Sequence, residues 1–78
     1  MPLPRRCNIT ILEDTGRTYR GVRSSLPSQT SAAISRALRA AQAAAHRGHC
    51  AEMHRHAQDA RATMERRLDM LLGARSRR

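Results

Sequence analysis

The fold is decided by residues 29–53, QTSAAISRALRAAQAAAHRGHCAEM, which contain two helix-forming segments joined at Gly48. The segment before Gly48 is rich in alanine and holds no glycine, proline or acidic residue. Gly48 is expected to take the left-handed conformation that ends many helices. The sequence therefore predicts helices over residues 29–47 and 50–72, which the short link packs as an antiparallel pair.

Apolar residues recur at three- and four-residue spacing on both expected helices, as they do on helices with one buried face. The larger members of these stripes, which are the expected core and interface residues, are Ile34, Leu38, Met53, Met64, Leu68 and Leu71. Alanines fill much of the rest, and the chain has no Phe or Trp. Because so thin a core buries little surface, we expect a second copy to complete it and form a homodimer.

Residues 7–24 carry a different pattern. The stretch CNITILE, residues 7–13, alternates apolar and polar side chains, which favours a strand. Residues 14–16, Asp-Thr-Gly, have the composition of a three-residue hairpin loop with a left-handed glycine. We therefore expect an α+β fold in which an N-terminal β-hairpin over residues 7–24 packs on the antiparallel helix pair, since an isolated hairpin is unstable. Both ends are basic: residues 1–6 are expected to be a loose arm and residues 74–78 a flexible tail.

Charge is the strongest signal in the composition. The chain has 78 residues, enough for one small domain, and a formal net charge of +9 from fifteen basic and six acidic residues. All fifteen basic residues are arginines. A GC-rich genome accounts for arginine in place of lysine, but not for the shortage of acids. The excess lies on the expected hairpin, the first helix and the tail, whereas residues 50–72 balance four arginines with four acids. Such segregation favours a polyanionic partner.

Arginine suits phosphate because its planar guanidinium donates two parallel hydrogen bonds. The expected contact residues are Arg20, Arg23, Arg36, Arg39, Arg47, Arg75, Arg77 and Arg78. A single aromatic residue is too few for base stacking, so we expect contact with a duplex backbone or groove. The leading interpretation is a non-enzymatic accessory or regulatory protein that binds nucleic acid. The alternative is a protein–protein adaptor or small chaperone, whose helix pair engages a partner and whose arginines meet an acidic protein.

Two short stretches resemble known families. Residues 19–23, YRGVR, resemble the start of the plant ethylene-response-factor DNA-binding domain, which implies DNA reading from a β-sheet. The resemblance covers five residues, and the Trp-Gly-containing continuation and third strand of that family are absent. Gly48, Ala51 and Glu52 look like the turn of a tetratricopeptide helix pair, which implies peptide binding, but the large residues of that repeat are missing. Neither stretch assigns the chain to a family.

All four histidines lie within residues 46–56, together with Cys50. Cys50 and His54 are four residues apart, a spacing that lets two side chains on one helical turn reach the same metal ion. The set matches no established ligand spacing, however, so we expect no metal and no cofactor. No paired carboxylates, Ser/His/Asp set or glycine-rich phosphate loop indicates catalysis, and we expect no enzymatic activity.

Cys7 and Cys50 are too few to form a disulfide framework. Residues 1–6 lack the apolar stretch of a signal peptide, and no apolar run approaches the length of a membrane span. We therefore expect two reduced thiols in a cytoplasmic protein that makes no membrane contact.

Overall fold

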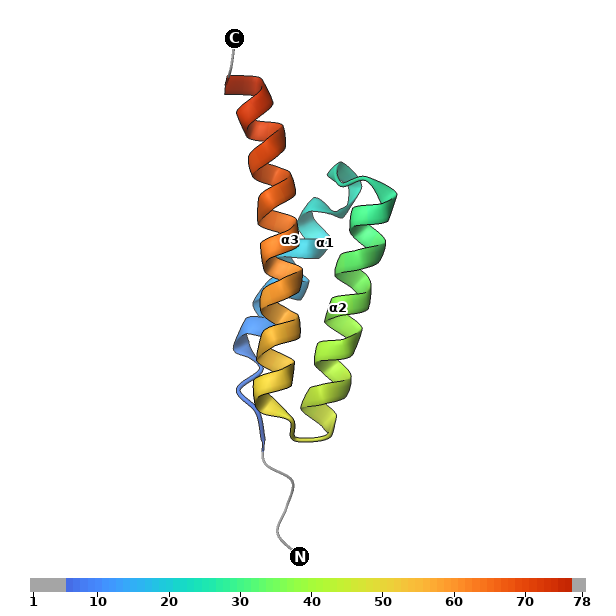
Figure 1. The fold of residues 1–78 in the computed structure, drawn as a ribbon, viewed down its shortest axis with the longest axis vertical. Helices are drawn as coiled ribbons and strands as arrows, with labels where there is room; N and C mark the ends of the chain where they lie inside the picture. The colour runs from blue at the N-terminus through green and yellow to red at the C-terminus, as the bar shows by residue number, and fades with distance from the viewer. Residues whose placement is uncertain (1–5, 77–78) are drawn as a thin grey trace, which may run out of the picture.

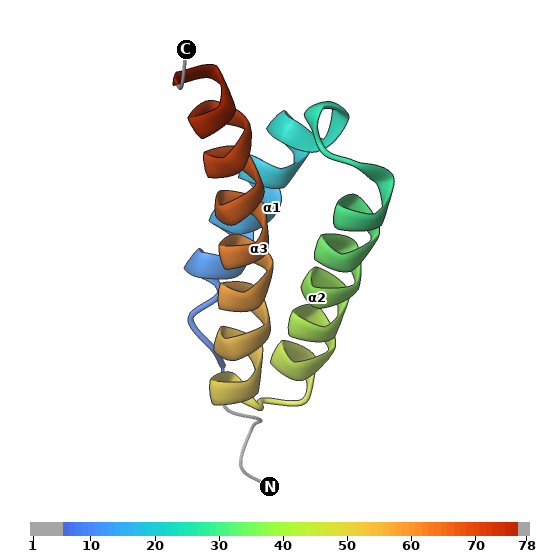
Figure 2. The ribbon, with the colours of Figure 1, turned by 45° about the horizontal axis from the view of Figure 1, so that its top comes forward.

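The computed structural model describes the backbone of residues 6–76 and the side chains of residues 6–69. This part of the chain forms three α-helices and one turn of 3-10 helix: α1 (Thr10–Val22), η1 (Arg23–Ser25), α2 (Ser28–His46) and α3 (Cys50–Ser76). α2 and α3 run antiparallel, and α1 packs against both (Figures 1 and 2). Residues 6–76 contain no strand, so the expected α+β fold is wrong: the described chain is all-α.

The segment expected to form a β-hairpin, residues 7–24, contains α1 instead. Leu12, Thr15 and Tyr19 follow one another at spacings of three and four residues, and all three are buried. This spacing places them on one face of a helix. α1 therefore satisfies its backbone hydrogen bonds internally, whereas a two-stranded hairpin would need a further partner.

Two local signals favour a strand and a turn in this segment, and both are misleading. Ile9 and Ile11 alternate with polar residues, yet Ile9 precedes the helix and is 41% exposed. Gly16 lies inside α1, and among the described residues a positive φ occurs at Gly48 alone. The Asp-Thr-Gly sequence of residues 14–16 therefore fits inside a helix, because Leu12, Thr15 and Tyr19 form a buried helix face around it.

α2 ends in a Schellman motif centred on Gly48. The φ angle of Gly48 is 75°, the left-handed conformation that the sequence predicts. The N–H of His49 donates to the carbonyl oxygen of Ala44 at 2.9 Å, and the N–H of Gly48 donates to that of Ala45 at 3.0 Å. These bonds satisfy two terminal carbonyl groups of α2 and reverse the chain, so that α3 returns along α2 (Figure 1).

The two helices of the expected pair are present, with shifted ends. α2 is Ser28–His46, where residues 29–47 are expected from the sequence. α3 continues past the expected end at residue 72 to Ser76, so residues 74–76 of the expected flexible tail are helical. Residues 77–78 and residues 1–5 of the expected loose arm lie outside the described residues.

The core lies between the three helices as two clusters along the α2–α3 pair. One cluster contains Leu12, Ala41, Ala44, Met53 and Ala57. The other contains Tyr19, Leu26, Ile34, Ala60 and Met64. Leu38 is partly buried and packs against both clusters, and Leu68 packs against the second. The fully buried alanines let the helix backbones approach closely, and α1 covers the stripes that the sequence leaves open to a second chain.

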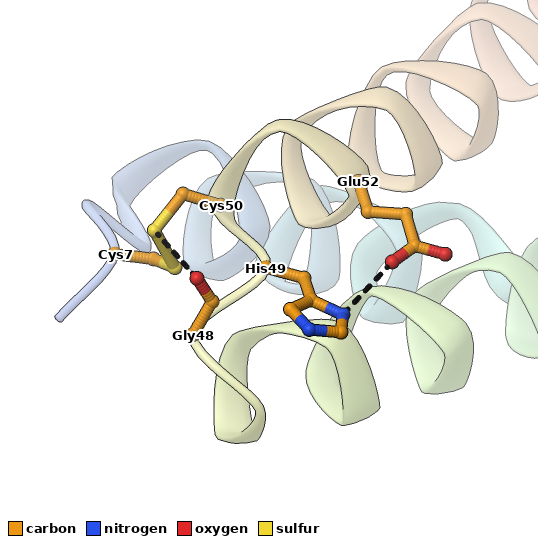
Figure 3. The surroundings of a disulfide bond; sticks show 5 residues. All are labelled: Cys7, Gly48, His49, Cys50 and Glu52. Carbon is orange, nitrogen blue, oxygen red and sulfur yellow. Dashed lines mark hydrogen bonds and ion pairs between the residues drawn. A yellow bond between two sulfur atoms is a disulfide. The ribbon is translucent and has the colours of Figure 1, made fainter. Parts of the chain in front are cut away.

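A disulfide between Cys7 and Cys50 fastens the segment before α1 to the first residue of α3 (Figure 3). Their Cα atoms are 5.1 Å apart. The Sγ atom of Cys50 also lies 3.7 Å from the carbonyl oxygen of Gly48, so the bridge sits against the turn between α2 and α3. The expectation of two reduced thiols is therefore wrong.

The first turn of α3 carries one further polar contact beside the disulfide. Nδ1 of His49 lies 3.2 Å from a carboxylate oxygen of Glu52 (Figure 3). A carboxylate at this position also interacts favourably with the positive end of the helix dipole. Within the described residues, no helix combines the length and the apolar character that crossing a membrane requires.

Candidate nucleic-acid interface

Three of the expected phosphate-binding arginines come together between α1 and α2. Arg20 of α1, Arg23 of η1 and Arg39 of α2 line one hollow of about 720 Å³. It also has four serines in its lining: Ser24, Ser28, Ser31 and Ser35. The part of the chain that the structure describes contributes no Asp or Glu to this lining. We call it the serine–arginine hollow.

Tyr19 fixes the wall of the serine–arginine hollow. Its hydroxyl donates to the carbonyl oxygen of Ser31 at 3.0 Å and lies 2.9 Å from the hydroxyl oxygen of Ser35. Because the phenol has a single proton, Ser35 is then the donor in the second bond. The bond with Ser35 and the charge of Arg23 hold the pKa of the Tyr19 phenol below its usual value, although burial acts in the opposite direction. α1 is thereby tied to α2 next to the arginines.

The start of α2 lies at the same hollow. Pro27 precedes the helix and offers no capping side chain, and the first turn holds no acidic residue. Helix N-termini present free N–H groups and the positive end of the dipole. Ser28, the first residue of α2, lines the hollow, so the N-terminus of α2 lies at the hollow that Arg20, Arg23 and Arg39 also line.

The remaining expected arginines do not join this hollow. Arg36 and Arg47 are exposed, but neither lines it. Arg47 follows the last residue of α2, about 12 Å along the helix axis from Arg39 at 1.5 Å per residue. The backbone of Arg75 lies in α3, its side chain is not described, and residues 77–78 lie outside the described residues. The tail part of the prediction therefore stays a prediction.

The opposite side of α1 has a different charge. A smaller hollow of about 480 Å³ between α1 and α3 has Asp59, Arg61 and Glu65 in its lining, and Nε of Arg61 donates to Glu65 at 2.9 Å. Arg61 therefore faces acids on this side, whereas no described Asp or Glu lines the serine–arginine hollow.

The large apolar residues assigned to the core or an interface lie inside the molecule where their side chains are described. Ile34, Met53 and Met64 are at most 2% exposed. Leu38 and Leu68 are partly buried and pack against the core clusters, whereas the side chain of Leu71 is not described.

The pair with metal-ligand spacing does not form a metal site. The sulfur of Cys50 is bonded to that of Cys7, so no thiolate is present to bind a metal ion. His54 is exposed. Among the described residues, no group of three or more His, Cys, Asp or Glu side chains is placed to hold a metal ion.

Comparison of the chain with protein-family models, curated proteins and solved structures finds no match. The lining of the hollow has the residue types of an anion site: three arginines, four serines and the first residue of a helix, with no Asp or Glu among the described residues. Sequence reasoning missed its serines and the position of Tyr19. The signal for Tyr19 is its three-and-four spacing with Leu12 and Thr15, which predicts the helix that brings its side chain to the serines of α2.

Proposed function

We propose that this chain is a non-enzymatic nucleic-acid-binding protein that holds the phosphate backbone of a duplex in the serine–arginine hollow. The single observation that carries the proposal is the convergence of Arg20, Arg23 and Arg39 on one hollow that no described acid enters. Guanidinium groups bind phosphate bidentately, and serine hydroxyl groups donate to its remaining oxygens.

Contact with the backbone is favoured over base stacking by the position of the aromatic ring. Tyr19 is 7% exposed and its hydroxyl is engaged with α2, so it offers no face to a nucleobase. Proteins that bind single-stranded nucleic acids stack the bases on exposed aromatic rings. Backbone phosphates of a duplex need only charge and hydrogen-bond donors, which the hollow supplies.

The test is the salt dependence of binding to a random DNA duplex, measured by fluorescence anisotropy of the labelled duplex. The test variant replaces Arg20, Arg23 and Arg39 by Gln. Each lost phosphate contact lowers the slope of log K against log salt by about 0.9, so the variant should lose about 2.7 from the slope. Its matched control replaces Arg55, Arg61 and Arg66, three exposed arginines of α3, by Gln.

Both variants lose three positive charges, so a difference between their slopes depends on where the arginines lie and not on the net charge of the protein. The proposal expects the control to keep a slope within about one of the wild type. Equal losses in the two variants would show that binding follows total charge and not the hollow. No detectable binding of the wild type at about 50 mM salt would refute the proposal altogether.

A further inference from the structure

The face between α1 and α2 has a second half, next to the serine–arginine hollow, that phosphate binding does not use. A groove of about 820 Å³ runs between the first turns of α1 and the last turns of α2. Its apolar lining includes Leu12, Leu38 and Ala45, and the exposed side chain of Ile9 stands at its edge. We call it the α1–α2 groove.

Small residues keep the α1–α2 groove open. Gly16 lines it from α1, and a Cβ atom placed there would meet no other atom within 4 Å. On α2 the small residue in the groove lining is Ala45. The Cys7–Cys50 disulfide holds the chain just before α1 against the start of α3, with Cys7 itself in the lining (Figure 3). The groove is therefore part of the folded architecture.

The polar residues around the groove are mostly cationic. Arg6, Arg17 and Arg20 are exposed and line it, against one acid, Glu13. Arg17 also lies 3.7 Å from Asp14, but both side chains are largely exposed, so water screens that pair. An occupant that suits this surface carries apolar groups in the middle and negative charge at its flanks.

This chemistry discriminates between possible occupants. A second copy of this chain brings a formal charge of +9 to a cationic rim, which opposes association. A nucleic-acid backbone offers charge but no apolar groups to cover Ile9 and the exposed part of Leu38. A partner helix with apolar residues on one face and acidic residues beside them satisfies both requirements.

We propose that the α1–α2 groove binds one acidic amphipathic helix of a partner protein. The dimensions agree with this occupant: residues 9–20, which flank the groove, span about 16 Å at 1.5 Å per residue. Helix anchors at positions i, i+4 and i+7 span about 10.5 Å, so three apolar side chains fit along it. This surface differs in chemistry from the serine–arginine hollow, although Tyr19 and Arg20 line both.

The experiment uses the full, oxidised chain and a fluorescein-labelled peptide of about 14 residues with leucines at i, i+4 and i+7 and glutamates beside them. A scrambled peptide of the same composition disperses the leucines around the helix. The test variant is Gly16→Leu, which fills the groove from within. Its matched control is Gly21→Leu, a change in the same helix at a glycine that is also unobstructed but lines no part of the groove.

Wild type and Gly21→Leu should bind the amphipathic peptide alike, and Gly16→Leu should bind at least about tenfold more weakly, since anchors then lose their site. Binding should weaken as salt rises. Ile9→Ser, a substitution at an exposed residue, provides a second variant that leaves the core untouched and should also weaken binding. Circular dichroism checks that all variants fold.

Several results would overturn the proposal. Equal affinity for the scrambled peptide would mean that charge alone attracts the peptide. No binding up to about 1 mM peptide, or equal binding by wild type, Gly16→Leu and Ile9→Ser, would exclude the groove as the site. If sedimentation shows a wild-type dimer that Gly16→Leu converts to a monomer, the occupant is a second copy. Loss of duplex binding in Gly16→Leu would assign the groove to nucleic acid instead.

Discussion

The disulfide between Cys7 and Cys50 should supply a large part of the stability of this small domain. The two cysteines are 43 residues apart in the sequence. Closing a loop of that length removes about 13 cal/mol/K of entropy from the unfolded chain, or about 4 kcal/mol at 25 °C. A Cys7→Ser, Cys50→Ser variant should therefore lose about 4 kcal/mol of unfolding free energy. Since each kcal/mol shifts the Tm of such a domain by about 4–8 °C, the Tm should fall by about 16–32 °C.

α1 should be the first element to suffer from this loss. It has 13 residues and contains Gly16 and Gly21, which weaken a helix. Helices of this length are marginal without tertiary contacts. The bridge anchors its N-terminal side, whereas Tyr19 anchors the other end on α2. Without the bridge, helix content should fall before the α2–α3 pair unfolds.

Urea denaturation followed by far-ultraviolet circular dichroism measures this effect in three samples: oxidised wild type, reduced wild type and the double-serine variant. The two samples without the bridge should agree with each other, and the variant should not respond to a dithiol reductant. A difference in unfolding free energy below about 1 kcal/mol between oxidised wild type and the variant would mean that the disulfide contributes little to stability. Two titratable thiols in the unfolded, unreduced protein would show that the bridge does not form.

Four single substitutions make three predictions about the packing and the turn. Tyr19→Phe removes two hydrogen bonds to α2 and should cost about 1 kcal/mol in urea denaturation, without loss of helix content. Ile34→Ala empties a fully buried site and should cost about 2–5 kcal/mol, seen as a lower thermal midpoint. Gly48→Ala places a Cβ atom at a φ of 75° and should cost about 1–2 kcal/mol, whereas Gly21→Ala should stabilise α1 by about 1 kcal/mol.

Each of these three has a result that contradicts it. A Tyr19→Phe protein as stable as wild type would mean that the phenol bonds α2 no better than it bonds water. An Ile34→Ala protein with an unchanged midpoint would place Ile34 outside the core. Equal effects of alanine at Gly48 and at Gly21 on stability would mean that Gly48 does not adopt the left-handed conformation.

The antiparallel helix pair could be predicted from the sequence because its signals are long and agree with one another. Three features indicate an antiparallel helix pair: the alanine-rich segment, the turn residue Gly48, and the large apolar residues on the buried face of each helix. These residues are Ile34 on the first helix and Met53 and Met64 on the second. The packing of α2 against α3 is consistent with all of these features. The position of Gly48 also sets the direction of α3, so the topology of this part follows from one turn.

The first element could not be predicted in the same way, because residues 7–24 carry competing short signals. The alternation of Ile9 and Ile11 covers only a few residues, and Gly16 is compatible with either a turn or an unobstructed helix position. The decision depends on what the α2–α3 pair offers: a face that accepts Leu12 and Tyr19 at helical spacing. The three-and-four spacing of Leu12, Thr15 and Tyr19 is present in the local sequence, but only these tertiary contacts decide between it and the alternation.

The candidate site was predictable in its residue type and sign of charge, but not in its position. Arg20, Arg23 and Arg39 are among the predicted phosphate contacts, yet the expected hairpin gives no reason for them to meet. The disulfide was also missed, because a pairing of Cys7 with Cys50 requires α1 to lie against α3. The meeting of the three arginines and the pairing of the two cysteines both depend on a helix at residues 10–22 that packs against α2 and α3.

Titration of the ¹⁵N-labelled protein with a short DNA duplex, followed by NMR, tests whether phosphate binds between α1 and α2. If it does, the largest shift changes occur at the backbone amides of Arg20, Arg23 and Ser28 and at the side-chain Nε of Arg39, all around the serine–arginine hollow. The exposed outer face of α3 should change little. Shifts concentrated on α3, or spread evenly over all arginines, would place the bound duplex elsewhere and rule out the serine–arginine hollow as its site.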